Sequence, residues 1–217
     1  MDDPLLAVAW PRRTARLSIR RATPTDVDAT WAFRQLEEGN RWLTRAPSSV
    51  EEYRDAFVDP DRLVATLVEL DGLVIGDLML RVEDAWGQAE VADRAAGVQA
   101  EIGWALHPDH VGHGYATEAV RELIRLCFED LGLRRVTGSC FAANQASRRL
   151  MERVGMRREA HTIRDSLHRS GEWLDGMDYA LLREEWAPLP PRSRGPGRRR
   201  RPADVGRRGV GDPELTD

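Results

Sequence analysis

The chain has 217 residues, of which 41% are hydrophobic and 31% charged, and its formal net charge is −4. This length supports one domain with a real core, and without a long uncharged apolar run a membrane-spanning helix is excluded. The first residues have neither a basic start nor a small-residue cleavage pattern, so no signal peptide is indicated. Cys127 and Cys140 are too few for a disulfide framework, and we expect a cytoplasmic protein.

Composition divides the chain into a flexible leader at 1–14, a folded domain at 15–186 and a tail at 187–217. The tail is rich in Pro, Gly and Arg, and it lacks the apolar side chains that would offset the entropy of ordering it. We therefore expect it to be disordered and solvated. Its eight arginines outnumber its four acids, so the domain is more acidic than the whole chain. An acidic domain favours a cationic small partner, and nucleic acid is expected at most through the tail.

The domain shows strand and helix patterns in alternation. Thr23 and Pro24 form a helix start, and the pair Asp71-Gly72 is typical of a hairpin turn. The expected elements, in chain order, are a strand at 16–21, a helix from 24 to about 38, a short helix from 48 or 49, strands at 63–70, 73–82 and 101–106, a long helix from about 116 to 131, a strand at 136–141, a helix at 144–154, and strands at 157–167 and 172–182. This order predicts an α/β mixture around a mixed sheet, with the long helix crossing between two adjacent strands.

The most informative segment joins the strand at 101–106 to the long helix. Its turn contains Gly112 and Gly114, which leave the first amides of the helix open to an approaching anion. The turn is therefore a candidate phosphate cradle, although an ordinary strand–helix turn has the same composition. It has neither the Gly-Lys-Ser/Thr of a Walker loop nor the third glycine of a dinucleotide-binding turn.

At these residues the chain resembles the GNAT family of acetyl-coenzyme A-dependent N-acetyltransferases. The family pattern Arg/Gln-x-x-Gly-x-Gly/Ala falls on 111–116, with Gly114 and Ala116 in the small positions and Val111 in place of Arg or Gln. The segment from Asn144 to Gly155 resembles a second family pattern. The end of the domain, at 173–186, is similar to the branch that acetylates ribosomal-protein N-termini, the Rim type.

The resemblance implies a GNAT fold, with a mixed, mostly antiparallel sheet of six to seven strands and about four helices, splayed where the cofactor enters. It implies that acetyl-coenzyme A (acetyl-CoA) lies between the strands at 101–106 and 135–141. The residues implied to bind it are Ala105 and Leu106 through backbone groups, Val111, Gly112, His113, Gly114, Tyr115, Ala116 and Thr117 around the pyrophosphate, and Asn144 and Ser147 near the thioester.

The implied reaction is direct attack of a neutral primary amine on the thioester, which leaves two proton transfers to assign. Glu101 is the candidate general base; otherwise it is a solvated acid at a strand edge. Ser147 is the candidate acid for the departing thiolate, as in the Rim-type branch; otherwise it is a helix cap. Many family members use a Tyr seven residues after the Asn, but here Met151 stands at that position. A backbone amide of the strand at 101–106 is expected to stabilise the oxyanion.

The remaining candidates have weaker assignments. His107, His110 and His113 lack the partners of a metal site, and no metal is expected. Trp31, Phe33 and Trp42 line the acceptor side or belong to the core. The acceptor is a protein N-terminus or a small amine, and because dimers are common in the family, a homodimer is one assembly to test. The alternative function is a non-catalytic acyl-CoA sensor or an interaction module with an Arg-rich tail.

Overall fold

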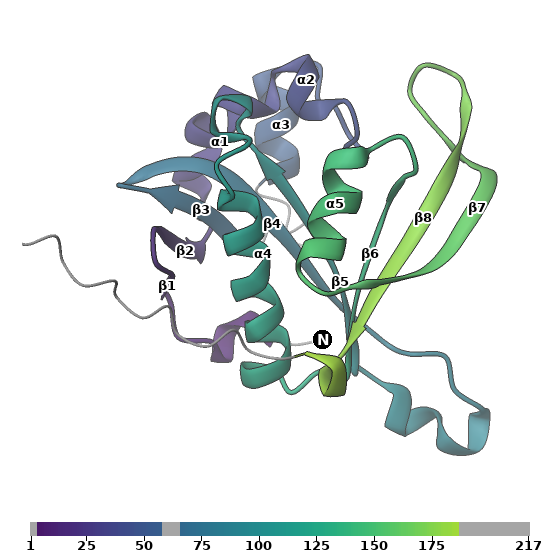
Figure 1. Ribbon diagram of the computed structural model, residues 1–217. Coiled ribbons are helices and arrows are strands. Elements are labelled where there is room, and N and C mark those ends of the chain that lie inside the picture. The colour runs from purple at the N-terminus through teal and green to yellow at the C-terminus, as the bar shows by residue number, and fades with distance from the viewer. Residues whose placement is uncertain (1–3, 58–65, 187–217) are drawn as a thin grey trace, which may run out of the picture. The chain divides into compact units, whose positions relative to one another are not determined.

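A computed structural model describes residues 4–57 and 66–186, and in these residues eight strands form one sheet (Figure 1). The spatial order is β1-β2-β3-β4-β5-β6-β8-β7. The bounds are β1 Arg12–Arg13, β2 Leu17–Arg21, β3 Thr66–Leu70, β4 Leu73–Glu83, β5 Gln99–Leu106, β6 Arg135–Phe141, β7 Arg157–Leu167 and β8 Trp173–Leu182. Neighbours run antiparallel except β5 and β6, which are parallel because a helix crosses between them. The predicted mixed, mostly antiparallel sheet is confirmed.

Five α-helices lie in the described residues: α1 Val27–Arg34, α2 Glu37–Asn40, α3 Val50–Phe57, α4 Tyr115–Arg125 and α5 Gln145–Arg153. The single helix expected from 24 to about 38 is divided into a 3-10 turn, α1 and α2. Leu36 is extended between α1 and α2, and the Asn40 side chain donates a hydrogen bond to the carbonyl of Arg34 where α1 ends. The division explains why the helices outnumber the expected four.

The core lies between the sheet and the helices α4 and α5, which Figure 1 shows in front of it. The apolar stripe predicted for the long helix is buried at Val120, Leu123 and Cys127. Adjacent strand residues point to opposite faces, so Leu78 faces this core whereas Asp77 faces α1 on the other side. The cavity described below lies on the α1 side.

The N-terminal segment is packed where the structure describes it. Residues 4–7 form a 3-10 helix, and β1 pairs with β2. Leu5 and Val8 are buried against Leu126, which follows α4. The sequence predicts a flexible leader over 1–14, because its apolar residues show no period; their partner lies more than a hundred residues away. The two-residue β1 accounts for an eighth strand. The tail predicted at 187–217 lies outside the described residues.

Replacing Leu5 by Ala tests this packing. Because Leu5 is only 3% exposed, Leu5→Ala should lower the free energy of unfolding by about 2–3 kcal/mol, measured by urea denaturation. The matched control is Leu6→Ala, since Leu6 is 74% exposed and should change stability by less than about 0.5 kcal/mol. Equal effects of the two substitutions would contradict the packed segment.

Candidate functional site

The site begins where two parallel strands part. Strands β5 and β6 pair at three positions, the last of which joins Glu101 to Thr137. Beyond it, β5 continues to pair with β4, and β6 with β8, but the two no longer pair with each other. The predicted splay between these strands is therefore present, and one edge of β5 is open.

The phase of the ladder decides which residues present backbone groups to this opening. The N–H of His107 donates to the Ile75 carbonyl (2.8 Å). In an antiparallel ladder every second residue hydrogen-bonds to the neighbouring strand, so residues 101, 103 and 105 of β5 also bond to β4. Ala105 therefore turns its backbone groups towards β4, whereas Trp104 and Leu106 turn theirs towards the opening. Of the two residues that the resemblance implies, Leu106 thus presents backbone groups to the opening and Ala105 does not, and Trp104 presents its groups in the same way as Leu106.

The glycine turn has the backbone shape of an anion site at the start of α4. Gly112 and Gly114 have φ of 87° and 81°, in the left-handed region that favours glycine. Gly114 is the N-cap, and its carbonyl accepts the first helical hydrogen bond, from Glu118 N–H. The preceding amides, including those of Tyr115 and Ala116, have no partner within the helix. The Val111 side chain is 58% exposed.

Residues before β2 support the same turn. Arg16 donates to the carbonyl of His113 (3.0 Å) and to the carboxylate of Glu118 (2.7 Å), and its guanidinium lies 4.5 Å from the Tyr115 ring centroid. Thr14 also donates to Glu118 (2.6 Å). Burial works against ionisation of Glu118, but the hydrogen bonds from Thr14 and Arg16 hold its pKa below the ordinary value. Sequence analysis missed these supports, because their partners lie about a hundred residues away.

The start of α5 presents a second polar group. Asn144, a buried N-cap, accepts a hydrogen bond from Ser147 N–H (3.1 Å) and donates one to Ser147 Oγ (3.0 Å). Because Oγ accepts this bond, its own proton is available to another acceptor. Thr117 has a different partner: its hydroxyl accepts from Arg153 (2.8 Å), which joins α4 to α5.

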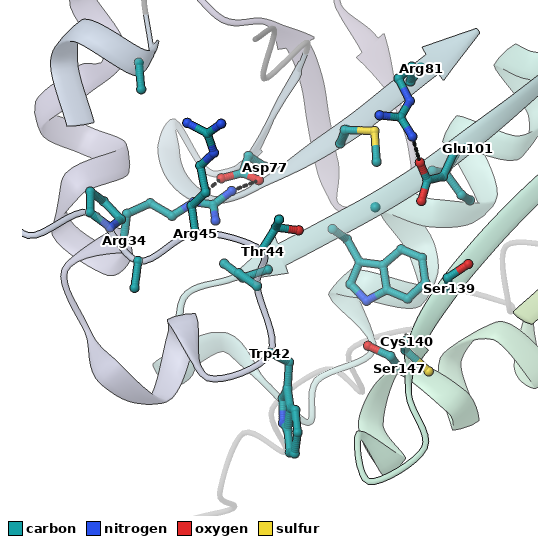
Figure 2. A pocket seen from close by; sticks show the side chains of 18 of the residues that line it. Arg34, Trp42, Thr44, Arg45, Asp77, Arg81, Glu101, Ser139, Cys140 and Ser147 are labelled. Atoms are coloured by element: carbon teal, nitrogen blue, oxygen red, sulfur yellow. Dashed lines mark hydrogen bonds and ion pairs between the residues drawn. The ribbon is translucent and has the colours of Figure 1, made fainter. Parts of the chain in front are cut away.

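A cavity of about 830 Å³ lies against the open side of β5 (Figure 2). Its wall includes Glu101, Asn144 and Ser147 from the predicted site, together with Trp42. The remaining lining comes mostly from α1, α3, β4 and the segment between α2 and α3: Arg34, Leu43, Thr44, Arg45, Ala46, Pro47, Glu52, Tyr53, Ala56, Phe57, Asp77, Met79, Arg81, Ile102, Gly103, Trp104, Ser139 and Cys140. The predicted base and acid thus line one cavity.

Three aromatic residues left open by the sequence are now placed. Trp42 lines the cavity, whereas Phe33 is 1% exposed and belongs to the core. Trp31 packs on Tyr53, with ring centroids 5.5 Å apart. Of the three, only Trp42 therefore lines the cavity.

Glu101 forms an ion pair with Arg81. Its carboxylate accepts a hydrogen bond from Arg81, which also binds Glu83 (2.7 Å), as the dashed line in Figure 2 marks for the first pair. The Glu101 side chain retains 27% of its exposure. Glu101 is thus an ion-paired, partly exposed acid that lines the cavity.

A buried ion pair forms part of the cavity wall. Arg34 donates two hydrogen bonds to Asp77 (2.9 and 2.6 Å), and Asp77 is 3% exposed. Burial raises the pKa of Asp77, and Arg34 opposes that shift. Sequence analysis missed the pair, yet a signal was present, because Asp77 interrupts the apolar run of β4.

The thiols are unsuited to nucleophilic attack. Burial raises the pKa of Cys127, and it raises that of Cys140 to about 11. Both are therefore protonated at neutral pH, and Cys140 is structural although it lines the cavity. Met151 is fully buried in the core. Among residues 4–57 and 66–186, no group of three His, Cys, Asp or Glu side chains is placed to hold a metal, and no helix could cross a membrane.

Comparison with known proteins agrees with this geometry. A family model described as an acetyltransferase (GNAT) domain matches residues 16–157. The chain is 31% identical over 176 residues to "Putative ribosomal N-acetyltransferase YdaF" of Bacillus subtilis (strain 168), covering 78% of this chain and 93% of that protein. It is 37% identical over 86 residues to "Uncharacterized N-acetyltransferase YnaD" of the same strain, covering 40% of this chain but only 50% of that protein.

A solved structure shares the fold over the same region. The GNAT-family acetyltransferase from Bacillus anthracis superposes with a TM-score of 0.69 at 26% identity, and the match covers 81% of this chain and all of that one. The family model spans well over half of the chain, and the YdaF match covers more than two thirds of it. The chain belongs to the GNAT family of N-acetyltransferases, enzymes whose acetyl donor is acetyl-CoA.

Proposed function

We propose that this enzyme acetylates the free amino terminus of a protein by direct attack in a ternary complex. The main support is the cavity, because Glu101 on β5 and Ser147 on α5 both line it beside the open edge of β5. The protein acceptor is supported by the name of the relative YdaF, a ribosomal N-acetyltransferase. A small primary amine is the competing acceptor, and the acetylation assay below separates the two.

The residues present fit acetyl-CoA. The amides at the start of α4 suit its pyrophosphate, because they are free, lie at the positive end of the helix dipole and follow two glycines with positive φ. Trp104 and Leu106 offer backbone groups to the pantetheine arm as an added strand would. The bound cofactor supplies an activated acetyl group.

Side chains of the protein carry out the two proton transfers. Glu101 takes the proton that the ammonium must lose before it can attack, directly or through a water. The Ser147 hydroxyl, oriented by Asn144, gives its proton to the departing sulfur. The N–H groups that β5 turns into the opening stabilise negative charge on the acetyl oxygen. The other contribution is to hold the two reactants together.

The glycine turn can be tested by binding alone. Gly114→Ala places a Cβ at φ 81°, so it should weaken acetyl-CoA binding about tenfold through roughly 1–2 kcal/mol of backbone strain at the cradle. The thermal midpoint is measured with and without acetyl-CoA, and ADP serves as ligand control. Gly132→Ala carries the same kind of strain (φ 68°) beyond the other end of α4 and should leave the ligand-induced shift unchanged. If both variants lose the acetyl-CoA-induced rise in thermal midpoint equally, the result would argue against pyrophosphate binding at the glycine turn.

The base is tested by Glu101→Gln. The amide keeps the shape but cannot take a proton, so kcat should fall by about 10²–10⁴-fold, whereas the thermal shift with acetyl-CoA persists. Glu83→Gln is the control, because Glu83 binds the same Arg81 but does not line the cavity. Unchanged turnover in Glu101→Gln would remove Glu101 from the mechanism.

The acceptor class is tested with matched peptides. We expect release of free coenzyme A with peptides that have a free amino terminus, and none with the same peptides after N-formylation, because the amine then lacks a basic lone pair. A panel of small primary amines is assayed in parallel. Turnover of small amines alone would replace the protein acceptor, and acetyl-CoA binding without turnover of any amine would favour the acyl-CoA sensor.

A further inference from the structure

We propose that His168 and Arg169 are positioning residues for the acceptor. They hold the segment between α2 and α3, here called the 41–47 loop, as one wall of the cavity. Trp42 to Pro47 all line the cavity, so the position of this loop sets its width. The inference deepens the proposed function, on which it rests, because it assigns a role in acceptor binding to residues outside the cavity.

Two hydrogen bonds tie the loop to the turn between β7 and β8. His168 Nε2 donates to the carbonyl of Arg41 (3.0 Å), and Arg169 Nη2 donates to the carbonyl of Leu43 (2.5 Å). The two segments are more than 120 residues apart in sequence. Figure 1 shows the β7–β8 hairpin extending past the rest of the sheet at the end where α2 lies.

The geometry of the hairpin turn fixes the donor on His168. Its Nδ1 accepts a hydrogen bond from Ser170 N–H (3.2 Å), so the ring hydrogen sits on Nε2 and points to Arg41. The turn is closed by a bond from His168 N–H to the Glu172 carbonyl and one from Gly171 N–H to the His168 carbonyl, both 2.9 Å. The imidazole is therefore held before it meets the loop.

Trp42 links the hairpin turn to the cavity wall. Its ring lies 5.4 Å from that of His168 and 5.8 Å from that of Phe141, and the Arg41 guanidinium lies 4.9 Å from its centroid. Phe141 is the last residue of β6, and its ring also lies 5.4 Å from that of His168, so the three rings form one cluster at the end of the strand that borders the opening. Figure 2 shows Trp42 on the opposite side of the cavity from Arg81 and Glu101.

In the described residues, the hydrogen bonds that hold the glycine turn and strand β5 come from elements other than the 41–47 loop. Thr14 and Arg16 support the glycine turn through hydrogen bonds. Strand β5 is held by its pairing with β4 along the edge opposite the opening. Loss of the two loop contacts should therefore change acceptor binding and leave donor binding and the chemical step intact. A residue with a merely structural role would affect all three together.

The test uses the full chain with His168→Ala, Arg169→Ala and the double substitution. With a peptide acceptor that has a free amino terminus, the double variant should raise KM for the peptide about tenfold, the size expected for loss of two hydrogen bonds. Its kcat and its KM for acetyl-CoA should stay within about twofold of the wild-type values. His168→Gln, which keeps a side-chain N–H donor, should restore most of the peptide KM. Ile163→Ala is the control, because Ile163 is 70% exposed on the same hairpin.

A second measurement needs no substrate. Trypsin cuts after arginine, so cleavage after Arg41 and Arg45, followed by mass spectrometry, reports how firmly the loop is held. Release of the loop should speed this cleavage about tenfold in the double variant and not in Ile163→Ala. If the wild type acetylates no amine, the proposed function fails, yet faster cleavage would still confirm that His168 and Arg169 hold the loop.

Three results would overturn the inference. The first is unchanged cleavage in the double variant. The second is faster cleavage with an unchanged peptide KM. The third is a joint loss of kcat, acetyl-CoA affinity and thermal midpoint, which would make the hairpin contact part of general stability rather than of acceptor positioning.

Discussion

Strands β5 and β6 pair over three positions and then separate, and the rest of the site depends on that separation. A sheet leaves no backbone group free between paired neighbours, so only a parted pair can offer a strand edge to a ligand inside the sheet. The crossover through α4 makes the two strands parallel and also places the first turn of α4 beside the opening. One topological choice therefore supplies both an open edge and a helix N-terminus.

The two sides of the site are built in different ways. In the function that we propose, the donor side consists mostly of backbone (glycine conformations, free amides and a strand edge), with the side chains of Asn144 and Ser147 near the thioester. The acceptor side that we propose is lined by side chains, among them Arg34, Asp77 and Trp42, on segments that precede β3 or belong to β4. A donor common to a whole family suits backbone recognition, whereas the acceptor wall can change with each side chain.

Sequence reasoning was most successful where a local pattern carries the information. The glycine turn at Gly112 and Gly114 and the hairpin at Asp71-Gly72 lie where their residue types predict. It failed where contacts join distant segments. The packing of Leu5, the support of the turn by Arg16 and the pairing of Arg34 with Asp77 each depend on a partner that no local window contains. Which residues of β5 face the opening depends on the phase of its hydrogen bonds to β4, so the pairing shows that Trp104 faces it and Ala105 does not.

The contact between Arg16 and Glu118 also bears on how the chain folds. It closes a loop of about a hundred residues, and the contact of His168 with Arg41 closes a longer one. Contacts of such separation form late, because the entropy of a long loop must be lost before they contribute any free energy. We therefore expect the sheet and α4 to assemble first, and the ability to bind either reactant to arise only near the end of a comparatively slow folding reaction.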